Sequence, residues 1–175
     1  IVTVQSTEMF TFRGESWVKI TFDGMKAASA LSAQVVSFFD GSANCLFFDF
    51  GDGRPRQKIT GSGSPLPDIV HHGTNKEGYK GICLEGELLA SGAPSAVYCA
   101  RTMEDVIDSG YHNGFIFQAR PSAMLASKAS SKNLLAVLPG VAITMDRRDE
   151  VLFHTESLEV LSCMSPWSIL EPLVR

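Results

Sequence analysis

The chain has 175 residues, 45% hydrophobic and 19% charged, which indicates one ordinary globular domain and excludes a disordered or fibrous chain. Its net charge of −4 gives no general attraction to phosphates, so a nucleic acid is disfavoured as a partner. The apolar runs are far too short to span a bilayer, and we expect neither a membrane partner nor a secretory leader.

The first 60 residues alternate β-type runs with turn signals. Residues 17–22 alternate polar and apolar side chains, which predicts a half-buried strand with Val18, Ile20 and Phe22 on one face. We therefore expect residues 1–60 to form a β-rich segment. A catalytic core of about 100 residues would be marginal alone, so we expect this segment to pack on the core that follows the Gly/Ser/Pro stretch at 61–67.

Two strand-helix units follow this stretch. An apolar run ends in His72-Gly73-Thr74, and the apolar spacing up to Gly86 predicts an amphipathic helix of two to three turns. The next strand, residues 96–100, carries Tyr98. Thr102 and Asp105 then resemble a capping box, which opens a short helix that ends at Gly110.

The second half is expected to be mainly β. Residues 115–117 indicate a buried strand, and residues 121–133 a loop with a helical turn. Further strands are predicted at 134–138, 141–145, 151–154 and 158–161, before a C-terminal tail at 166–175. Strands mixed with few helices and no internal repeat favour an α+β architecture.

The four cysteines, Cys45, Cys83, Cys99 and Cys163, are scattered without a C-x-x-C pair, which argues against a zinc ribbon or a redox motif. Two disulfides remain open. We favour four reduced cysteines packed as small hydrophobic residues, and with them a reducing, intracellular environment.

No G-x-G-x-x-G fingerprint of a Rossmann fold is present. Three short motifs instead resemble the His-Tyr-Glu branch of the ADP-ribosyltransferase superfamily, which includes poly(ADP-ribose) polymerases and diphtheria-type toxins. His72-Gly73-Thr74 is similar to its H-G-S/T strand end. Residues 96–100 (AVYCA) resemble its G-I/V-Y-x-A strand, with Ala96 in place of glycine. Residues 149–153 (DEVLF) resemble its N-E-Y-x-V strand, with aspartate in place of asparagine.

The resemblance covers residues 69–161, and its compact spacing is closest to short bacterial toxin members. It implies a split β-sheet core with a few short helices over residues 66–165, and an enzyme that cleaves the nicotinamide–ribose bond of NAD. NAD is then a substrate, no metal is implied, and the acceptor of ADP-ribose is unknown, with a protein favoured over a nucleic acid.

The resemblance also assigns the site residues. Glu150 would be the catalytic carboxylate, and a carboxylate near the ribose stabilises the oxocarbenium-like charge that forms as the bond breaks. His72 would hydrogen-bond a ribose hydroxyl, with support from Thr74, and the Gly73 backbone would contact the nicotinamide amide. Tyr98 would stack on the nicotinamide ring.

Tyr111, which lies just past the second predicted helix, is the best candidate for the opposite face of that ring. The adjacent His71 and His72 point to opposite faces of a strand, so a shared metal ion is disfavoured.

Two other functions stay open. An RNA 2′-phosphotransferase also has an H-G-T motif and consumes NAD, but that family has a histidine where this chain has Tyr98. A catalytically silent domain of the same fold, used as a binding module, is the second alternative.

Overall fold

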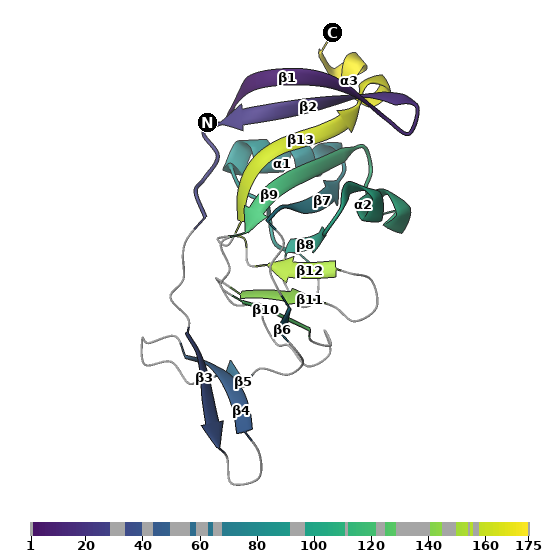
Figure 1. Ribbon diagram of the computed structural model, residues 1–175. Helices are drawn as coiled ribbons and strands as arrows, with labels where there is room; N and C mark the ends of the chain where they lie inside the picture. The colour runs from purple at the N-terminus through teal and green to yellow at the C-terminus, as the bar shows by residue number, and fades with distance from the viewer. Residues whose placement is uncertain are drawn as a thin grey trace.

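The computed structural model describes residues 2–28, 34–39, 44–49, 57–58, 63–64, 68–91, 97–110, 112–121, 125–128, 141–144, 150–153, 155 and 158–174. In the strands from 34 to 64, and at 125–128, 141–144 and 150–152, the description is of the backbone. The architecture is α+β, as the sequence predicts, and its described part has three short helices (Figure 1).

The larger sheet has ten strands within the described residues, and every pair in it is antiparallel except β10 with β11. Its strands in spatial order are β1 (Thr3–Phe12), β2 (Glu15–Asp23), β13 (Leu158–Pro166), β9 (Phe115–Pro121), β7 (Val70–Thr74), β8 (Val97–Ala100), β12 (Glu150–Phe153), β11 (Val141–Thr144), β10 (Leu125–Lys128) and β6 (Gly63–Ser64). A second sheet contains β3 (Gln34–Phe39), β4 (Asn44–Asp49) and β5 (Gln57–Lys58).

The first two strands form a hairpin with a two-residue turn. Arg13 and Gly14 both have positive φ angles, 49° and 77°, which the twist of a tight hairpin requires. The predicted alternation in β2 is confirmed, because Val18, Ile20 and Phe22 are buried together. β2 pairs with β13, so this hairpin lies at one edge of the larger sheet.

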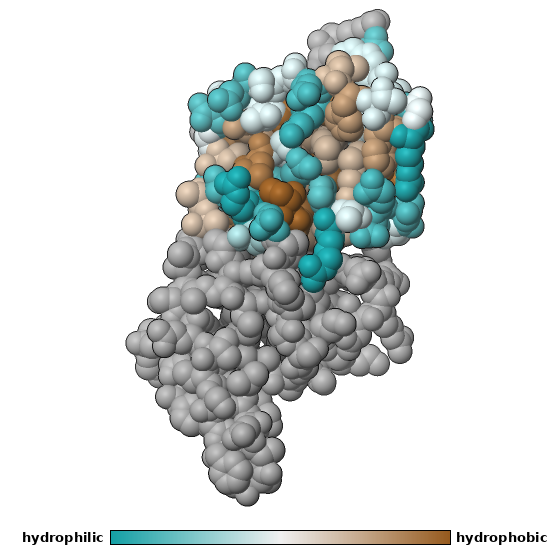
Figure 2. Space-filling model, in the orientation of Figure 1, coloured by the Kyte–Doolittle hydropathy of each residue, from teal (hydrophilic) through white to brown (hydrophobic). Residues whose placement is uncertain are grey.

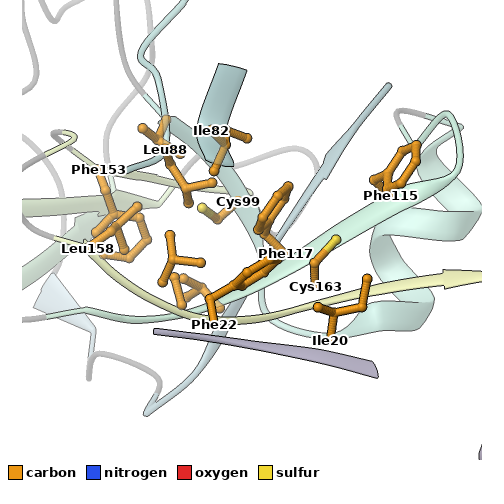
Figure 3. Close-up of a cluster of buried hydrophobic side chains, with 14 of the residues drawn as sticks. Ile20, Phe22, Ile82, Leu88, Cys99, Phe115, Phe117, Phe153, Leu158 and Cys163 are labelled. Atoms are coloured by element: carbon orange, nitrogen blue, oxygen red, sulfur yellow. The ribbon is translucent and has the colours of Figure 1, made fainter. Parts of the chain in front are cut away.

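Apolar side chains cover both faces of this sheet. On one face, Phe22 of β2 and Phe117 of β9 stack with ring centroids 6.2 Å apart, and they lie beside Cys163 and Ile20 (Figure 3). Helix α1 (Lys76–Glu85) contributes buried Ile82 to this cluster. We call this side the α1 face.

The opposite side, the α2 face, is formed by side chains that alternate with those of the α1 face. Ile116 of β9 and Met164 of β13 are buried there against Met103 and Val106 of helix α2 (Met103–Ser109). The contacts of α2 with β7 and β8 place this helix over the strands that carry His72 and Tyr98 (Figure 1).

Both predicted helices are present with the expected caps. Thr102 accepts a hydrogen bond from the Asp105 N–H over 3.1 Å and caps α2, and Gly86 ends α1 in a left-handed conformation. Helix α3 (Trp167–Val174) was not predicted; it occupies the predicted tail and buries Leu170.

The predicted loop at 121–133 contains a strand. β10 pairs in parallel with β11, and this pairing outweighs the loop-like composition. The predicted strand at 134–138 lies outside the described residues.

Large exposed apolar side chains of the described residues belong to β1, α1, the segment after α1, and α3 rather than to β7 or β8. They are Val4, Met9, Leu84, Leu89, Ile169 and Leu173. Figure 2 shows hydrophobic residues set among hydrophilic ones on the visible face of the described part. No helix of this part is long and apolar enough to cross a membrane.

Candidate active site

The three strands that carry the predicted catalytic residues are neighbours in the larger sheet, in the order β7, β8, β12. His71 of β7 lies opposite Ala100 of β8, and Ala100 lies opposite Glu150 of β12. Tyr98 is two residues from Ala100 and lies opposite Leu152. The fold thus brings the backbone positions of His72, Tyr98 and Glu150 together from distant parts of the chain.

β7 and β8 separate directly after their one paired position. β7 pairs with β9 along its full length, but with β8 only at His71 and Ala100. On its other side, β8 pairs with β12 at all four of its residues, 97–100. The backbone pairing that joins β7 to β8 is therefore a single position, and His72 to Thr74 continue beyond it along β7.

The side chain of His72 bridges the separating strands. Its Nδ1 atom lies 2.7 Å from the carbonyl oxygen of Tyr98. A carbonyl oxygen only accepts hydrogen bonds, so Nδ1 carries the proton and donates, which leaves Nε2 of the neutral ring as an acceptor. Burial lowers the pKa of His72, although the bond to Tyr98 opposes this shift. Near neutral pH, His72 therefore offers an acceptor nitrogen.

His71 is placed differently from its neighbour. Its Nδ1 lies 3.2 Å from the carbonyl oxygen of Arg101, and its Nε2 lies 3.2 Å from Nε2 of Gln118. Both ring nitrogens are thus used within the protein. Burial also lowers the pKa of His71. Of the two histidines, His72 is the one whose second nitrogen has no hydrogen bond to another described residue.

The side chains of His72 and Tyr98 start from opposite faces. Val70 is buried on the α1 face, and alternation along β7 places His72 on that side. Ala100 is buried on the α2 face, and the same rule places Tyr98 there, where it is partly buried. The two side chains therefore extend from opposite sides of the sheet on neighbouring strands.

Gly73 has a packing reason for lacking a side chain. A Cβ atom there would lie 2.7 Å from Cγ1 of Val106 and 3.0 Å from both Cα and Cβ of His112. The residue faces helix α2 and the segment after it, so close packing explains the glycine without a ligand. The expected contact of its backbone with nicotinamide stays a prediction.

Thr74 ends β7 and leads into α1. A Cβ atom at Gly78 would collide with its hydroxyl oxygen, so the Thr74 side chain lies against the first turn of this helix. The Thr74 carbonyl oxygen accepts a hydrogen bond from the Asn113 N–H over 3.2 Å. The segment after α2 is thereby attached to the end of β7.

Glu150 is described as a backbone position, and Tyr111 lies outside the described residues. No role was predicted for His112, but the structure places its ring 6.2 Å from that of Trp17 and its backbone against Gly73. Burial lowers the pKa of His112, whose Nδ1 accepts from the Gly114 N–H. Only its position just after Tyr111 could have drawn attention to it.

Cys83, Cys99 and Cys163 are free thiols. Burial raises the pKa of Cys99 and Cys163, so both thiols stay protonated and are poor nucleophiles. Within the described residues, no group of three His, Cys, Asp or Glu side chains could hold a metal ion.

Comparisons with protein-family models, with curated proteins and with solved structures find no match for this chain. The chemistry of the site therefore follows from its own residues. They are an acceptor nitrogen on His72, a partly buried tyrosine on the next strand, and a glutamate on the strand after that.

Proposed function

We propose that this protein is an NAD-dependent ADP-ribosyltransferase, which cleaves the bond between nicotinamide and ribose and transfers ADP-ribose to an acceptor. The catalytic residues would be His72, Tyr98 and Glu150. Gly73, Thr74 and Tyr111 would complete the NAD site as the resemblance implies.

One observation carries this proposal. The strands that bear the three motif residues are adjacent, and His72 Nδ1 is bonded to the backbone of Tyr98. Neither relationship is required by the sequence motifs, since the residues are far apart in the chain. A chance match of three short motifs would give no reason for their strands to be neighbours.

The local chemistry is compatible with a ribose hydroxyl. Nε2 of neutral His72 can accept a hydrogen bond, so it would orient a hydroxyl that donates to it. Glu150, two strands away, would stabilise the positive charge that develops on the ribose as nicotinamide leaves. The aromatic ring of Tyr98 would hold the flat nicotinamide ring.

A protein is the acceptor we favour. The net charge of −4 does not attract a nucleic acid in general. An RNA 2′-phosphotransferase is further disfavoured because Tyr98 occupies the position where that family has histidine.

The test is release of free nicotinamide from NAD, measured for the wild type, for Glu150→Gln and for a control, Glu159→Gln. Glu159 lies on β13, where its carboxylate is 3.8 Å from Arg120 at the surface. We expect release by the wild type and the control, and at least a hundredfold less, roughly the cost of losing one catalytic electrostatic group, with Glu150→Gln.

Two outcomes would contradict the proposal. If the wild type neither binds NAD nor releases nicotinamide, the result would favour a silent binding module. Removal of a 2′-phosphate from RNA would favour the phosphotransferase alternative. Mass spectrometry of a lysate treated with labelled NAD would identify the modified acceptor.

A further inference from the structure

A row of paired residues crosses the sheet on its α2 face, and its members on β13, β9 and β7 are polar. Ser162 of β13 lies opposite Gln118 of β9, and Gln118 lies opposite His71 of β7. His71 lies opposite Ala100, which lies opposite Glu150. Three consecutive members of this row are therefore polar, although Ile116 and Met164 on the same face are apolar.

The three polar side chains are joined by directed hydrogen bonds. The Ser162 hydroxyl donates to Oε1 of Gln118 over 2.9 Å. This fixes the amide of Gln118 with its NH2 group toward His71, where Nε2 accepts over 3.2 Å. Nδ1 of His71 must then carry the proton, and it donates to the Arg101 carbonyl oxygen. Each group thus has one role.

We propose that Ser162, Gln118 and His71 form a positioning relay, which holds the end of β8 against β7 and so sets where the two strands part beside His72. His71 is a positioning residue in this proposal, since its nitrogens contact Gln118 and Arg101 rather than a ligand. The consequence for catalysis rests on the proposed function, but the effect on His72 does not.

Burial and position support this role. Ser162 is 1% exposed and His71 is 9% exposed, so an unmatched hydrogen-bonding group there would cost stability. The Nδ1 atoms of His71 and His72 donate to the carbonyls of Arg101 and Tyr98, which lie on either side of Ala100. The two rings therefore fix β8 from both faces at the last paired position. Glu104 and Asp105 of α2 are the charged groups that act on His71.

Two substitutions of His71 separate the two links of its ring. Asparagine places an NH2 group near the position of Nδ1, so His71→Asn keeps a donor for Arg101 and loses the acceptor for Gln118. Glutamine reaches the position of Nε2, so His71→Gln keeps the acceptor and loses the donor. The matched control is Ser165→Ala, because the Ser165 hydroxyl is buried on the same strand as Ser162 and, among the described residues, hydrogen-bonds to its neighbour Pro166 rather than to Gln118.

The primary measurement is exchange of the His72 Nδ1 proton with solvent, followed by NMR without NAD. We expect His71→Gln to speed this exchange about tenfold, because β8 loses one attachment, and His71→Asn to speed it about threefold, because its donor to Arg101 is kept but is no longer oriented by Gln118. Ser165→Ala should leave the exchange unchanged. Equal exchange in folded His71→Gln and the wild type would overturn the relay.

If His71→Gln does not fold, Ser162→Ala replaces it. In the wild type, the His71 ring should then carry its proton on Nδ1. In Ser162→Ala, the ring should become a mixture of the Nδ1–H and Nε2–H tautomers. An Nε2–H tautomer in the wild type would overturn the relay.

The catalytic consequence is a second, separate measurement. With an active wild type, His71→Gln should raise KM for NAD about tenfold and change kcat less, since it displaces the binding edge rather than removing a reacting group. An unchanged KM would contradict the positioning role. If the wild type releases no nicotinamide, the proposed function fails, and the proton exchange still decides whether the relay exists.

Discussion

His72 donates a hydrogen bond from Nδ1 to the carbonyl oxygen of Tyr98 over 2.7 Å, where the backbones of β7 and β8 no longer pair. A side chain thus replaces a backbone ladder contact, and both partners belong to the three-residue constellation that the sequence motifs indicate. The remaining ring nitrogen is the part of His72 that can act on a ligand.

The two nitrogens of His72 can be tested separately. His72→Asn keeps a donor near Nδ1 and removes Nε2, whereas His72→Gln does the reverse. We expect His72→Asn to stay within about 1 kcal/mol of wild-type stability, because the bond to Tyr98 is retained, and to lose at least tenfold in NAD affinity. Urea unfolding and calorimetric NAD titration measure the two effects. Wild-type NAD affinity in His72→Asn would exclude Nε2 as a ligand contact.

Stability should decline at acidic pH because of the buried histidines. Burial lowers the pKa of His72 and His71 below 6.5, so the unfolded state binds more protons than the folded state as the pH falls through this value. Their contribution is fully present above about pH 6.5 and is lost toward the lower pKa of the folded state. The midpoint of thermal unfolding should fall between pH 7.5 and pH 5, and less steeply in His72→Asn. A pH-independent midpoint would contradict the neutral, buried state of these rings.

Activity should follow the same protonation. Neutral His72 offers an acceptor at Nε2, while the protonated ring has none, so nicotinamide release should be level near pH 7 and fall below pH 6.5. The rate profile of kcat/KM against pH measures this. A profile whose acidic limb lies well above pH 6.5 would point to another titrating group.

Two glycines should respond oppositely to alanine. In Gly73→Ala the new methyl group would meet Val106 and the backbone of His112, so we expect a loss of about 1–3 kcal/mol. In Gly81→Ala the nearest atom is Cδ1 of Leu89 at 3.5 Å, an ordinary contact, and helix propensity should add about 0.5–1 kcal/mol. Denaturant unfolding measures both. Adding Val106→Ala should recover part of the Gly73→Ala loss, and no recovery would place the strain at His112.

The capping residue of α2 matters because this helix packs over Gly73. Thr102→Ala removes the acceptor for the Asp105 N–H and should cost about 1 kcal/mol. Thr102→Ser keeps the hydroxyl and serves as the control. Equal unfolding free energies of the two variants would mean that the cap contributes nothing.

The proposed stacking by Tyr98 predicts a difference between two substitutions. Tyr98→Ala should weaken NAD binding by at least tenfold, since the aromatic face is lost, whereas Tyr98→Phe should be nearly silent. Equal losses in both variants would indicate that the hydroxyl group, rather than the ring, makes the important contact.

Local signals in the sequence predicted local structure well. The caps of α2 and α1 at Thr102 and Gly86 were correct, because each depends on a few adjacent residues. The buried face of β2 followed from its alternation. Helix α3 was missed, since it is short and contains Pro172, which argues against a helix.

The arrangement of the site depended on contacts that the sequence does not display. The motif strands were predicted singly, but their order in the sheet arises from pairing between segments far apart in the chain. The bond from His72 to Tyr98 requires β7 and β8 to separate after His71, and no local pattern marks that point. The packing of Val106 on Gly73 was hidden for the same reason.

The pairing of β2 with β13 also constrains how the protein reaches its fold. The β1–β2 hairpin is local in sequence and can form early, but its partner strand lies more than 130 residues away, between Leu158 and Pro166. Closing so large a loop is slow relative to forming the hairpin. During synthesis, the edge of β2 that later pairs with β13 would therefore stay unpaired until β13 has left the ribosome. The register between β1 and β2, which the turn at Arg13-Gly14 sets, would protect the hairpin from mispairing until then.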